Sequence, residues 1–499
     1  MAKKSRFATA LFLGLSTIIV LSAVGCTATT PAATTAPVNT TAPVNTTAPG
    51  DTAVPAATAI PPTATTIPTV LSTGKFCTEG APKITWFVGL GGGTDPDVIG
   101  NEQDWVNAYN KSQTYACVLL QVVHNPQSYD TLHAMMAAGT PPDIVGPVGK
   151  MGRENFKGSW ADITQLAKDA KIDLSNYDPA LMNFLKDNGV QIGLPFALFP
   201  GVIWYNKTLF DEAQLPYPPH KVGEKYDGKD WTIETMSELA KKLTVDANGA
   251  DATDPAFDHT KINQFGMWTG YTGARRLTAM FGGASLYDAN NNAVLPDAYK
   301  AAWKWYYDAI WTSWFMPNAD YSNSEKMGKG NPFGSGNTAM TWTPTWYTCC
   351  FDMKKMNWDI AAVPTYNGVL TAGIDGDTFS IPSGSKQQAL AFKVLHDFVM
   401  DKDLGPIYGG IPGNLALRDA FFKGMNAKVG TNVIDWQVAL DMLPYPDVPH
   451  HEAWMPNMSK SESFLDTWFG KLGQTPGLDL DKEFVTLQTG LDAVFKAAP

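Results

Sequence analysis

The sequence lacks the short signatures of common catalytic and nucleotide-binding sites. It contains no G-x-x-x-x-G-K-[ST] segment, so nothing indicates that this chain hydrolyses ATP itself. It also contains no G-x-S-x-G turn, the motif that carries the serine of many hydrolases. The segment His450-His451-Glu452 lacks the H-E-x-x-H spacing that places two imidazoles on one helical face. We therefore interpret these histidines as exposed loop residues.

Positive charge is also scarce. The chain has 37 Lys and Arg against 48 Asp and Glu, which gives a formal net charge of −11. Loss of the first 25 residues, which carry Lys3, Lys4 and Arg6, would leave the remainder more acidic still. Such a surface repels nucleic acid and anionic membranes. We expect no nucleic-acid partner, and we expect any membrane attachment to depend on lipid.

The N-terminus has the pattern of a secretory signal peptide. A basic start precedes an uncharged apolar run that ends in Ala23-Val24-Gly25-Cys26. Small residues before a cysteine resemble the lipobox of bacterial lipoproteins, in which the cysteine is acylated, although Ala23 stands where lipoboxes usually carry Leu. We predict a lipoprotein signal peptide over 1–26 with lipidation at Cys26. An uncleaved anchor is the alternative, because the run is nearly long enough to span a bilayer.

Residues 27–74 have almost no charge, Asp51 being the exception, and consist mainly of Thr, Ala, Pro and Val. Such a composition cannot bury a core. The segment 34–39 recurs at 40–45 and begins again at 46, with the Pro content of an extended, semi-stiff tether. We predict a disordered spacer here. Whether it carries O-linked sugars stays open.

Cysteine is rare, with five in the chain. An extracytoplasmic location permits disulfides, so Cys77 and Cys117 are compatible both with a bond that joins the tether exit to the second strand and with two separate cysteines. Cys349 and Cys350 are adjacent, and either a strained vicinal bridge or a reduced pair in a core fits the sequence. The spacings lack the paired C-x-x-C pattern of a zinc site.

One loop has oxygen ligands of the kind that calcium prefers. Asp246, Asn248, Asp251 and Asp254 lie close together in the sequence, but the EF-hand glycine is missing and Phe257 stands where that loop needs a carboxylate. We expect no metal ion and no cofactor, and leave calcium at this loop as the weaker alternative.

Beyond residue 74 the composition is that of a globular protein long enough for about two or three cores. Apolar periodicity predicts strands at 83–88, 117–123 and 142–145, separated by helices at 102–111 and 129–139. This order calls for a parallel sheet with right-handed crossovers, which binds ligands at the carboxyl ends of its strands. The loops after Val88 and Val145 are therefore candidate site segments.

Five segments resemble, in order, motifs of the family-1 extracellular solute-binding proteins, the sugar-binding receptors of bacterial ABC importers, and among them the maltose-binding-protein type. They are Gly139 to Val145, Ile192 to Lys207, Gly336 to Met340, Asp359 to Pro364, and Ser385 to Met400. Each motif alone is weak. Their common order over nearly all of residues 80–499 makes the resemblance strong.

The resemblance implies an α/β periplasmic-binding-protein-like fold, with two lobes joined by a multi-strand hinge and a cleft between them. We expect one lobe at 75–195 plus 360–420 and the other at 196–359 plus 421–499, with crossings near 193–197, 360–364 and 415–422. It further implies a monomeric receptor, not an enzyme, held by lipid at the extracytoplasmic face of the membrane. Such a receptor closes on a sugar or oligosaccharide and delivers it to an ABC permease.

Sugar sites need flat aromatic surfaces and a few carboxylates or amides. The chain has 16 Trp. By resemblance, Trp346 takes the position of the family's stacking aromatic and Tyr271 matches another. The remaining aromatic candidates for ligand contact are Trp268, Trp342, Trp454 and Phe464. Each of these aromatics would also be explained by burial in a core.

The opposite wall is predicted from the loop after the first strand. Gly92 and Gly93 would let a ligand approach the backbone, and Asp95 could accept hydrogen bonds from hydroxyls. Asp375 and Asp377, after a crossing strand, have the same capacity. A simple loop or turn explains each of these residues equally well.

Three further candidates come from the resemblance. Pro147 and Lys150 follow the third strand, and Phe199 lies beside the hinge. Pro147 stands where the family often has a stacking aromatic, and Phe199 replaces a polar residue. These departures put a maltose-like ligand in doubt.

Three other functions remain open from the sequence. A surface-anchored carbohydrate-active hydrolase would also be rich in Trp, but it would need two carboxylates facing each other across the scissile bond. A binding protein for a non-sugar solute such as a peptide would share the fold. A lipoprotein that only makes surface interactions is the third.

Overall fold

A computed structural model describes residues 69–70, 74–94, 96–124, 127–177, 182–183, 185–187 and 189–497. The predicted signal peptide, Cys26, nearly all of the predicted tether and Asp95 lie outside the described residues. Thr69–Val70, at the end of the predicted tether, forms strand β1 and pairs with Val122 and Gln121. The sheet therefore begins before the boundary at residue 74.

The elements that build the first lobe are β1, β2 (Lys83–Val88), α1 (Pro96–Ser112), β3 (Cys117–Val122), α2 (Gln127–Ala137), β4 (Ile144–Val148), α3 (Lys150–Asn155), α4 (Ile163–Ala170), β5 (Lys186–Asp187), β6 (Val190–Gln191), α10 (Gln388–Met400), α11 (Leu404–Tyr408) and β15 (Ile411–Pro412). The strands that run between the lobes are β7 (Leu194–Asn206) and β14 (Ile374–Ser380).

The elements that build the second lobe are α6 (Lys207–Ala213), β8 (Lys225–Tyr226), β9 (Lys229–Asp230), α7 (Ile233–Lys242), β10 (Val245–Asp246), β11 (Ile262–Thr269), η1 (Arg276–Phe281), α8 (Asp297–Trp311), α9 (Ala319–Ser322), η2 (Glu325–Met327), β12 (Thr338–Pro344), η3 (Thr345–Cys349), β13 (Trp358–Ala361), α13 (Gln437–Met442), α14 (Met458–Gln474) and α15 (Leu480–Lys496). The segment η4 (Leu415–Leu417) and α12 (Arg418–Lys428) contacts both lobes: the N–H of Leu415 donates a hydrogen bond to the carbonyl of Asn176 in the first lobe, α12 packs on α11 and β15, and Phe421 belongs to the second core.

The first lobe contains the predicted β-α-β-α-β unit. β2 pairs in parallel with β3 on one side and with β4 on the other, and α1 and α2 form the crossovers. Asp143, in the first of the five motifs, connects the elements of this unit through hydrogen bonds. Its carboxylate accepts hydrogen bonds from the backbone N–H of Thr85 at 2.9 Å and from the hydroxyl of Ser385 at 2.8 Å. The motif thus has a structural cause, since it joins β4, β2 and the segment before α10.

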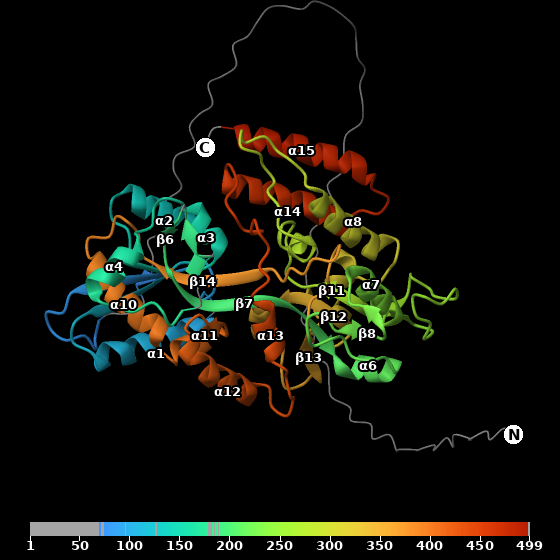
Figure 1. Cartoon of the computed structure of the whole chain (residues 1–499), viewed down its shortest axis with the longest axis horizontal. Helices are drawn as coiled ribbons and strands as arrows, with labels where there is room; N and C mark the ends of the chain where they lie inside the picture. Colours follow the sequence, from blue (N-terminus) through green and yellow to red (C-terminus); the bar gives the residue numbers. More distant parts are fainter. Residues whose placement is uncertain are drawn as a thin grey trace, which may run out of the picture. The chain divides into compact units, whose positions relative to one another are not determined.

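Strand β7 runs through both lobes and is buried along its whole length. Its first half pairs with β14, and its second half pairs with β12 and β13. Figure 1 shows β7 passing from the elements of the first lobe to those of the second. Asn206 ends the strand and begins α6, because its side chain accepts a hydrogen bond from the N–H of Thr208. One strand therefore serves as the floor that both lobes share.

The two lobes have separate cores, and the division along β7 is visible in its side chains. Leu194 packs in the first core, whereas Trp204 packs in the second. Val363 and Ala372 also belong to the second core. The predicted lobe boundary at residue 360 is therefore wrong: β13 pairs with the second half of β7, and the chain returns to the first lobe only at β14.

Cys77 and Cys117 are joined by a disulfide. The bond holds the segment after β1 against the start of β3, which decides between the two possibilities left open by the sequence. Among the described residues, no helix has both the length and the apolar character that crossing a bilayer requires.

Candidate functional site

A cavity of about 360 Å³ opens where the two lobes meet the crossing strands. The first lobe supplies the loop after β2, the first residues of α2 and α3, and the last residues of α11. The second lobe supplies η1, η3 and the loop before α14, and the crossing strands form the floor. The lining residues are Leu90, Gly91, Gly92, Gly93, Val98, Tyr129, Gly149, Met151, Gly152, Phe199, Arg276, Trp346, Cys349, Asp375, Asp377, Ile407, Tyr408 and Glu452.

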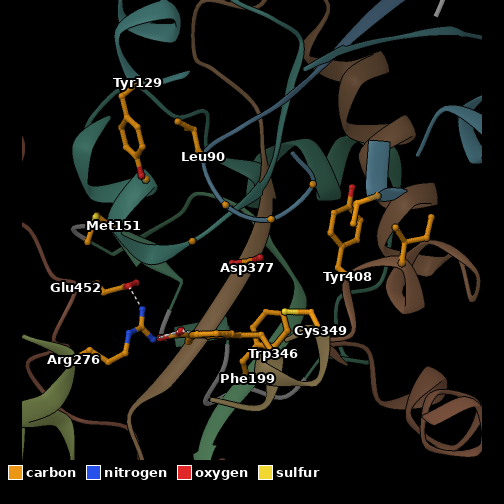
Figure 2. A pocket seen from close by; sticks show the side chains of 18 residues that line it. Leu90, Tyr129, Met151, Phe199, Arg276, Trp346, Cys349, Asp377, Tyr408 and Glu452 are labelled. Carbon is orange, nitrogen blue, oxygen red and sulfur yellow. Dashed lines mark hydrogen bonds and ion pairs between the residues drawn. The ribbon is translucent and has the colours of Figure 1, made fainter. Parts of the chain in front are cut away.

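Trp346 provides a flat apolar surface in this cavity (Figure 2). It lies on η3, which begins where Pro344 ends β12. Its indole Nε1 donates a hydrogen bond of 2.8 Å to Oδ2 of Asp375 on β14. The guanidinium of Arg276 lies 6.0 Å from the ring centroid. The ring is therefore held in place by a hydrogen bond at its edge and by a cation near its face, and it remains part of the cavity wall.

Arg276 lies between two carboxylates. It forms an ion pair with Asp375 and another with Glu452, whose Oε1 is 2.6 Å from Nη2 of the arginine. Burial opposes the charged form of Asp375, but Arg276 and His451 outweigh this effect and hold the pKa of that carboxyl well below its usual range. Asp375 is thus a permanent anion whose charge is already balanced by protein cations.

The histidine pair lies directly behind Asp375. His450 and His451 are buried, with 6% and 2% of their surface exposed, so the prediction of exposed loop histidines is wrong. Nδ1 of His451 lies 3.1 Å from Asp447, and its Nε2 lies 3.4 Å from Asp375. Burial alone would lower the pKa of His451, but the two aspartates more than offset it and raise the pKa to about 9. His451 is therefore a buried cation between two anions.

The donor atoms of Asp375, His450 and His451 lie within 4.8 Å of one another, which is close enough to consider a metal ion. Both ring nitrogens of His450 are already engaged, Nε2 with the carbonyl of Ile374 at 2.9 Å and Nδ1 with the N–H of Glu452 at 3.0 Å. His451 carries a proton on the side that would face the ion. His450 is held by backbone groups and the protonated His451 by two aspartates, so the three residues do not fit a cation.

The acidic loop considered for calcium also uses its oxygens internally. Asp246 accepts hydrogen bonds from the N–H groups of Asn248, Ala250 and Asp258. Asp251 accepts from the N–H of Thr253 at 2.7 Å. These carboxylates stabilise turns of the backbone, as Asx residues commonly do.

Asp377 differs from Asp375, although both point from β14 toward the same side. It lies in the middle of the lining residues in Figure 2, and within the described part of the chain no hydrogen bond is donated to it. Burial raises the pKa of Asp377 to about 7, an effect that the charge of Arg153 only partly offsets. Asp377 is therefore a carboxyl in the cavity that remains available to another molecule.

The glycine loop after β2 forms the opposite wall. Gly93 has a φ of +101°, and a Cβ there would lie 2.4 Å from Oε1 of Glu102. Its lack of a side chain therefore makes room for Glu102, not only for a ligand. Glu102 in turn accepts a hydrogen bond from the hydroxyl of Tyr408, and burial raises the pKa of Glu102 to about 8. Tyr408 is held by a buried carboxyl that is largely protonated at neutral pH.

The profile of the bacterial extracellular solute-binding proteins matches residues 95–399. The chain belongs to this family. Its members bind solutes, so this protein is a binding component and not an enzyme.

Solved structures resemble the chain over most of its length. UspC from M. tuberculosis is 18% identical, with 82% of this chain and 100% of that chain covered and a TM-score of 0.62. An ABC substrate-binding protein from Listeria monocytogenes in complex with cycloalternan is 18% identical, with 83% and 98% covered and a TM-score of 0.60. Maltose-bound T. maritima MalE3 is 17% identical, with 83% and 100% covered and a TM-score of 0.58. At these identities the likeness establishes the periplasmic-binding-protein-like fold.

Several predicted ligand contacts of this solute-binding protein line the cavity. They are Gly92, Gly93, Phe199, Trp346, Asp375 and Asp377. Pro147 and Lys150 do not line it: Pro147 lies within β4, and Lys150 forms a buried ion pair with Glu154 of its own helix. The third-strand loop reaches the cavity through Gly149 and Met151 instead.

The other predicted aromatics lie outside the cavity. Tyr271 is 49% exposed and packs beside Trp346, with ring centroids 5.9 Å apart, so it extends the aromatic surface beyond the rim. Trp268 packs behind Tyr271, and Trp342 is fully buried. Phe464 packs within the second lobe against Gly490. Trp454 packs against Tyr287, and Nζ of Lys157 from the first lobe lies 5.5 Å from the centroid of its ring. For Trp342 and Phe464 the reading as core residues is the one that fits.

Sequence reasoning missed four polar or aromatic residues of the cavity: Tyr129, Arg276, Tyr408 and Glu452. Tyr129 was predicted only as part of a helix. Arg276 and Glu452 lie in η1 and in a loop, where no periodicity marks them. Only composition pointed to Arg276. The chain has few positive charges, and an Arg that is buried usually has a charged partner.

Proposed function

We propose that this protein is the lipid-anchored receptor of a bacterial ABC importer and captures a small, uncharged sugar in the cavity between its lobes. The observation that carries the proposal is the pairing of a fixed indole surface, Trp346, with an available carboxyl, Asp377, in one cavity. A sugar has an apolar ring face and a rim of hydroxyls, which match these two groups. Cycloalternan and maltose, bound by two proteins of the same fold, support this class of ligand.

The charge of the cavity favours a neutral ligand. The charge of Arg276 is balanced by Asp375 and Glu452, so no excess positive charge faces the space. Among the described residues that line the cavity, an anionic sugar acid or phosphate would meet Asp377 and Glu452 without an unbalanced cation to pair with, which is unfavourable in a buried site. Hydroxyl groups can donate to both carboxylates without this penalty.

The size of the cavity favours a short ligand. About 360 Å³ is near the lower end of the range for small-molecule sites, roughly 300–1,000 Å³. We therefore expect a monosaccharide or disaccharide and not a long oligosaccharide. Phe199 on the floor narrows the space where the family often has a polar residue.

Capture would proceed by closure of the lobes. Trp346 and Arg276 belong to the second lobe, whereas Tyr129 and Tyr408 belong to the first. A ligand that touches both walls stabilises the closed arrangement to the extent that it binds that arrangement better than the open one. A permease that recognises the closed pair of lobes would then receive the sugar, and a separate ATPase subunit would supply the energy.

The ligand class can be tested with a thermal-shift screen of the full chain against sugars, polyols, peptides and amino acids. A ligand that binds only the folded state raises the melting temperature, by mass action. We expect small neutral sugars to do so and to be recovered chemically unchanged. A shift with peptides alone would overturn the sugar assignment, and recovery of a cleaved sugar would overturn the receptor.

Anchoring rests on Cys26 and the tether, and it needs its own test. We expect Cys26→Ala to abolish lipidation, to release the protein from the membrane fraction and to leave sugar binding unchanged, because the tether separates the anchor from the lobes. Integral membrane association of the variant would indicate an uncleaved helix in place of the lipid.

A further inference from the structure

Two adjacent cysteines lie at the wall of the cavity, beside the indole surface. Cys349 ends η3, the same short helix that carries Trp346, and both residues line the cavity. Figure 2 shows the sulfur of Cys349 next to the Trp346 ring. The Sγ atoms of Cys349 and Cys350 are 2.7 Å apart. The side chain of Asn331 holds the turn by donating a 2.6 Å hydrogen bond to the carbonyl of Cys350.

We propose that Cys349 and Cys350 form a disulfide between neighbouring residues, and that this bond makes a rigid apolar surface that extends the Trp346 face of the site. Three observations support it: the sulfurs already face each other, Cys349 is exposed and thus accessible to an oxidant, and the chain forms a disulfide elsewhere, between Cys77 and Cys117. The extracytoplasmic location that favours oxidation rests on the proposed function.

The chemistry requires an oxidant, which would be a disulfide of the surrounding compartment, such as oxidised glutathione. The thiolate of one cysteine attacks the disulfide of glutathione and releases one molecule of reduced glutathione. The neighbouring cysteine then attacks the mixed disulfide, the Cys349–Cys350 bond forms, and a second reduced glutathione leaves. Two protein S–H groups are oxidised, one external disulfide is reduced, and the two protons leave on the glutathione thiols.

The bond would act on binding through rigidity. The bond restricts the side chains of Cys349 and Cys350 at the end of η3. The wall beside Trp346 therefore loses less conformational entropy when a sugar packs against it. The S–S group also replaces two separate side chains with one continuous polarizable surface, which suits the apolar face of a sugar ring. The oxidised protein should therefore bind a sugar more tightly than the reduced protein.

The bond itself is tested without any ligand. The full chain is incubated with oxidised glutathione, treated with an alkylating reagent and digested with trypsin, which places both cysteines in the peptide 330–354. We expect this peptide to resist alkylation and to be lighter by two hydrogen atoms. Alkylation of both cysteines, while Cys77 and Cys117 stay joined as the internal control, would overturn the proposal. Cys350→Ser cannot close the bond, so its Cys349 should be alkylated without the oxidant and should carry one glutathione after treatment with it.

The position of the bond in the site is tested by fluorescence, again without ligand. A disulfide quenches an indole in contact with it, so oxidation should lower the emission of the protein. Trp346→Phe should lose most of this difference, whereas Trp454→Phe, which lies outside the cavity, should keep it. A difference that persists in Trp346→Phe would show that the bond lies away from the binding surface.

The effect on binding is then measured with maltose, tagatose and mannotriose, the sugars bound in relatives of this fold. For a sugar that binds, reduction should weaken the affinity by about 3- to 10-fold, the effect of releasing one or two side chains, and Cys350→Ser should bind like the reduced protein. Equal affinities would overturn the role in binding. Formation of the bond with no sugar bound would instead count against the proposed function.

Discussion

The indole nitrogen of Trp346 in the second lobe donates a hydrogen bond of 2.8 Å to Asp375 on the crossing strand β14. The same carboxylate forms an ion pair with Arg276 and faces His451 at 3.4 Å. Its negative charge is therefore balanced by protein groups. Asp377 lies two residues further along the strand and on the same side, and no described residue forms a hydrogen bond or ion pair of this kind with its carboxyl group. The two aspartates look equivalent in the sequence but have different roles. Asp375 positions the aromatic surface, and Asp377 is available to bind the ligand.

Asp375→Asn should destabilise the protein strongly. The substitution keeps the shape but removes the charge that balances Arg276 and His451, and breaking a buried ion pair in this way costs about 3 to 5 kcal/mol. Urea unfolding at pH 7 measures the loss.

Asp377→Asn is the matched control on the same strand. Because burial raises the pKa of Asp377 to about 7, its charged form is already disfavoured in the folded state. We expect the free energy of unfolding to stay the same or to rise slightly at pH 8. An equal decrease in the free energy of unfolding for the two variants would show that the two carboxyl groups contribute to stability in the same way.

Trp346→Ala should weaken sugar binding and leave folding nearly intact. The loss of a buried aromatic anchor in a binding site is worth about 1 to 3 kcal/mol of affinity. Trp454→Ala removes an aromatic of the same type outside the cavity and should leave the affinity unchanged. Calorimetric titration with a sugar found in the screen measures both. A large fall in melting temperature with unchanged affinity would place Trp346 in the core.

The regular parts of this fold could be predicted because their apolar residues repeat with a fixed period. The strand over 83–88 appears where the pattern places it, and the strand after Gly336 appears where the family resemblance places it. Trp346 could be found through the family resemblance. Asp375 and Asp377 were expected in a loop after a crossing strand, but they lie within the crossing strand β14 itself. Arg276 and Glu452 could not, because they lie in irregular segments that only tertiary packing brings together.

The histidines illustrate a second limit. A metal-binding motif is recognised by the spacing of its ligands, and His450-His451 does not have that spacing. The sequence therefore led us to expect that both histidines are exposed to solvent. The partner that buries them is Asp447, four residues earlier, with Asp375 from a distant strand. A charged histidine can be buried only where such anions meet it. The contact between His451 and Asp375 forms only in the folded chain, so no local sequence pattern indicates it.

Sugar affinity should depend on pH near neutrality through Asp377. The carboxylate accepts hydrogen bonds from two hydroxyls, whereas the protonated form uses one oxygen as a donor. With a pKa of about 7 for Asp377, we expect the affinity to rise from pH 6 to pH 8 as the competent fraction grows and then to level off. Titrations across this range measure it, and Asp377→Asn should bind with a flat profile. A wild-type profile that falls with pH would assign the protonated acid as the contact.

Stability should fall as the solution becomes alkaline because of His451. Its pKa is about 9 in the folded protein and 6.5 as the ordinary value, so the folded state holds a proton that the unfolded chain releases. This contribution is fully present below pH 6.5 and is lost as the pH rises through 9. Unfolding in urea at pH 7 and pH 9 measures the loss. His451→Gln should be less stable at pH 7 and should vary less between the two values, whereas an unchanged slope would assign it to another group, such as Glu102.

Binding should bring the lobes together, and small-angle scattering should report it. The cavity is lined by Tyr129 and Tyr408 from one lobe and by Trp346 and Arg276 from the other, so a ligand in contact with both walls favours the closed arrangement. The radius of gyration should therefore decrease at saturating sugar. Trp346→Ala at the same sugar concentration provides the control, because it removes one of the two walls and should shift the scattering curve back toward that of the ligand-free protein. If the radius is identical with and without a sugar that is shown to bind, the lobes do not close on their ligand, and recognition by a permease would have to rest on the ligand-filled surface and not on a change in shape.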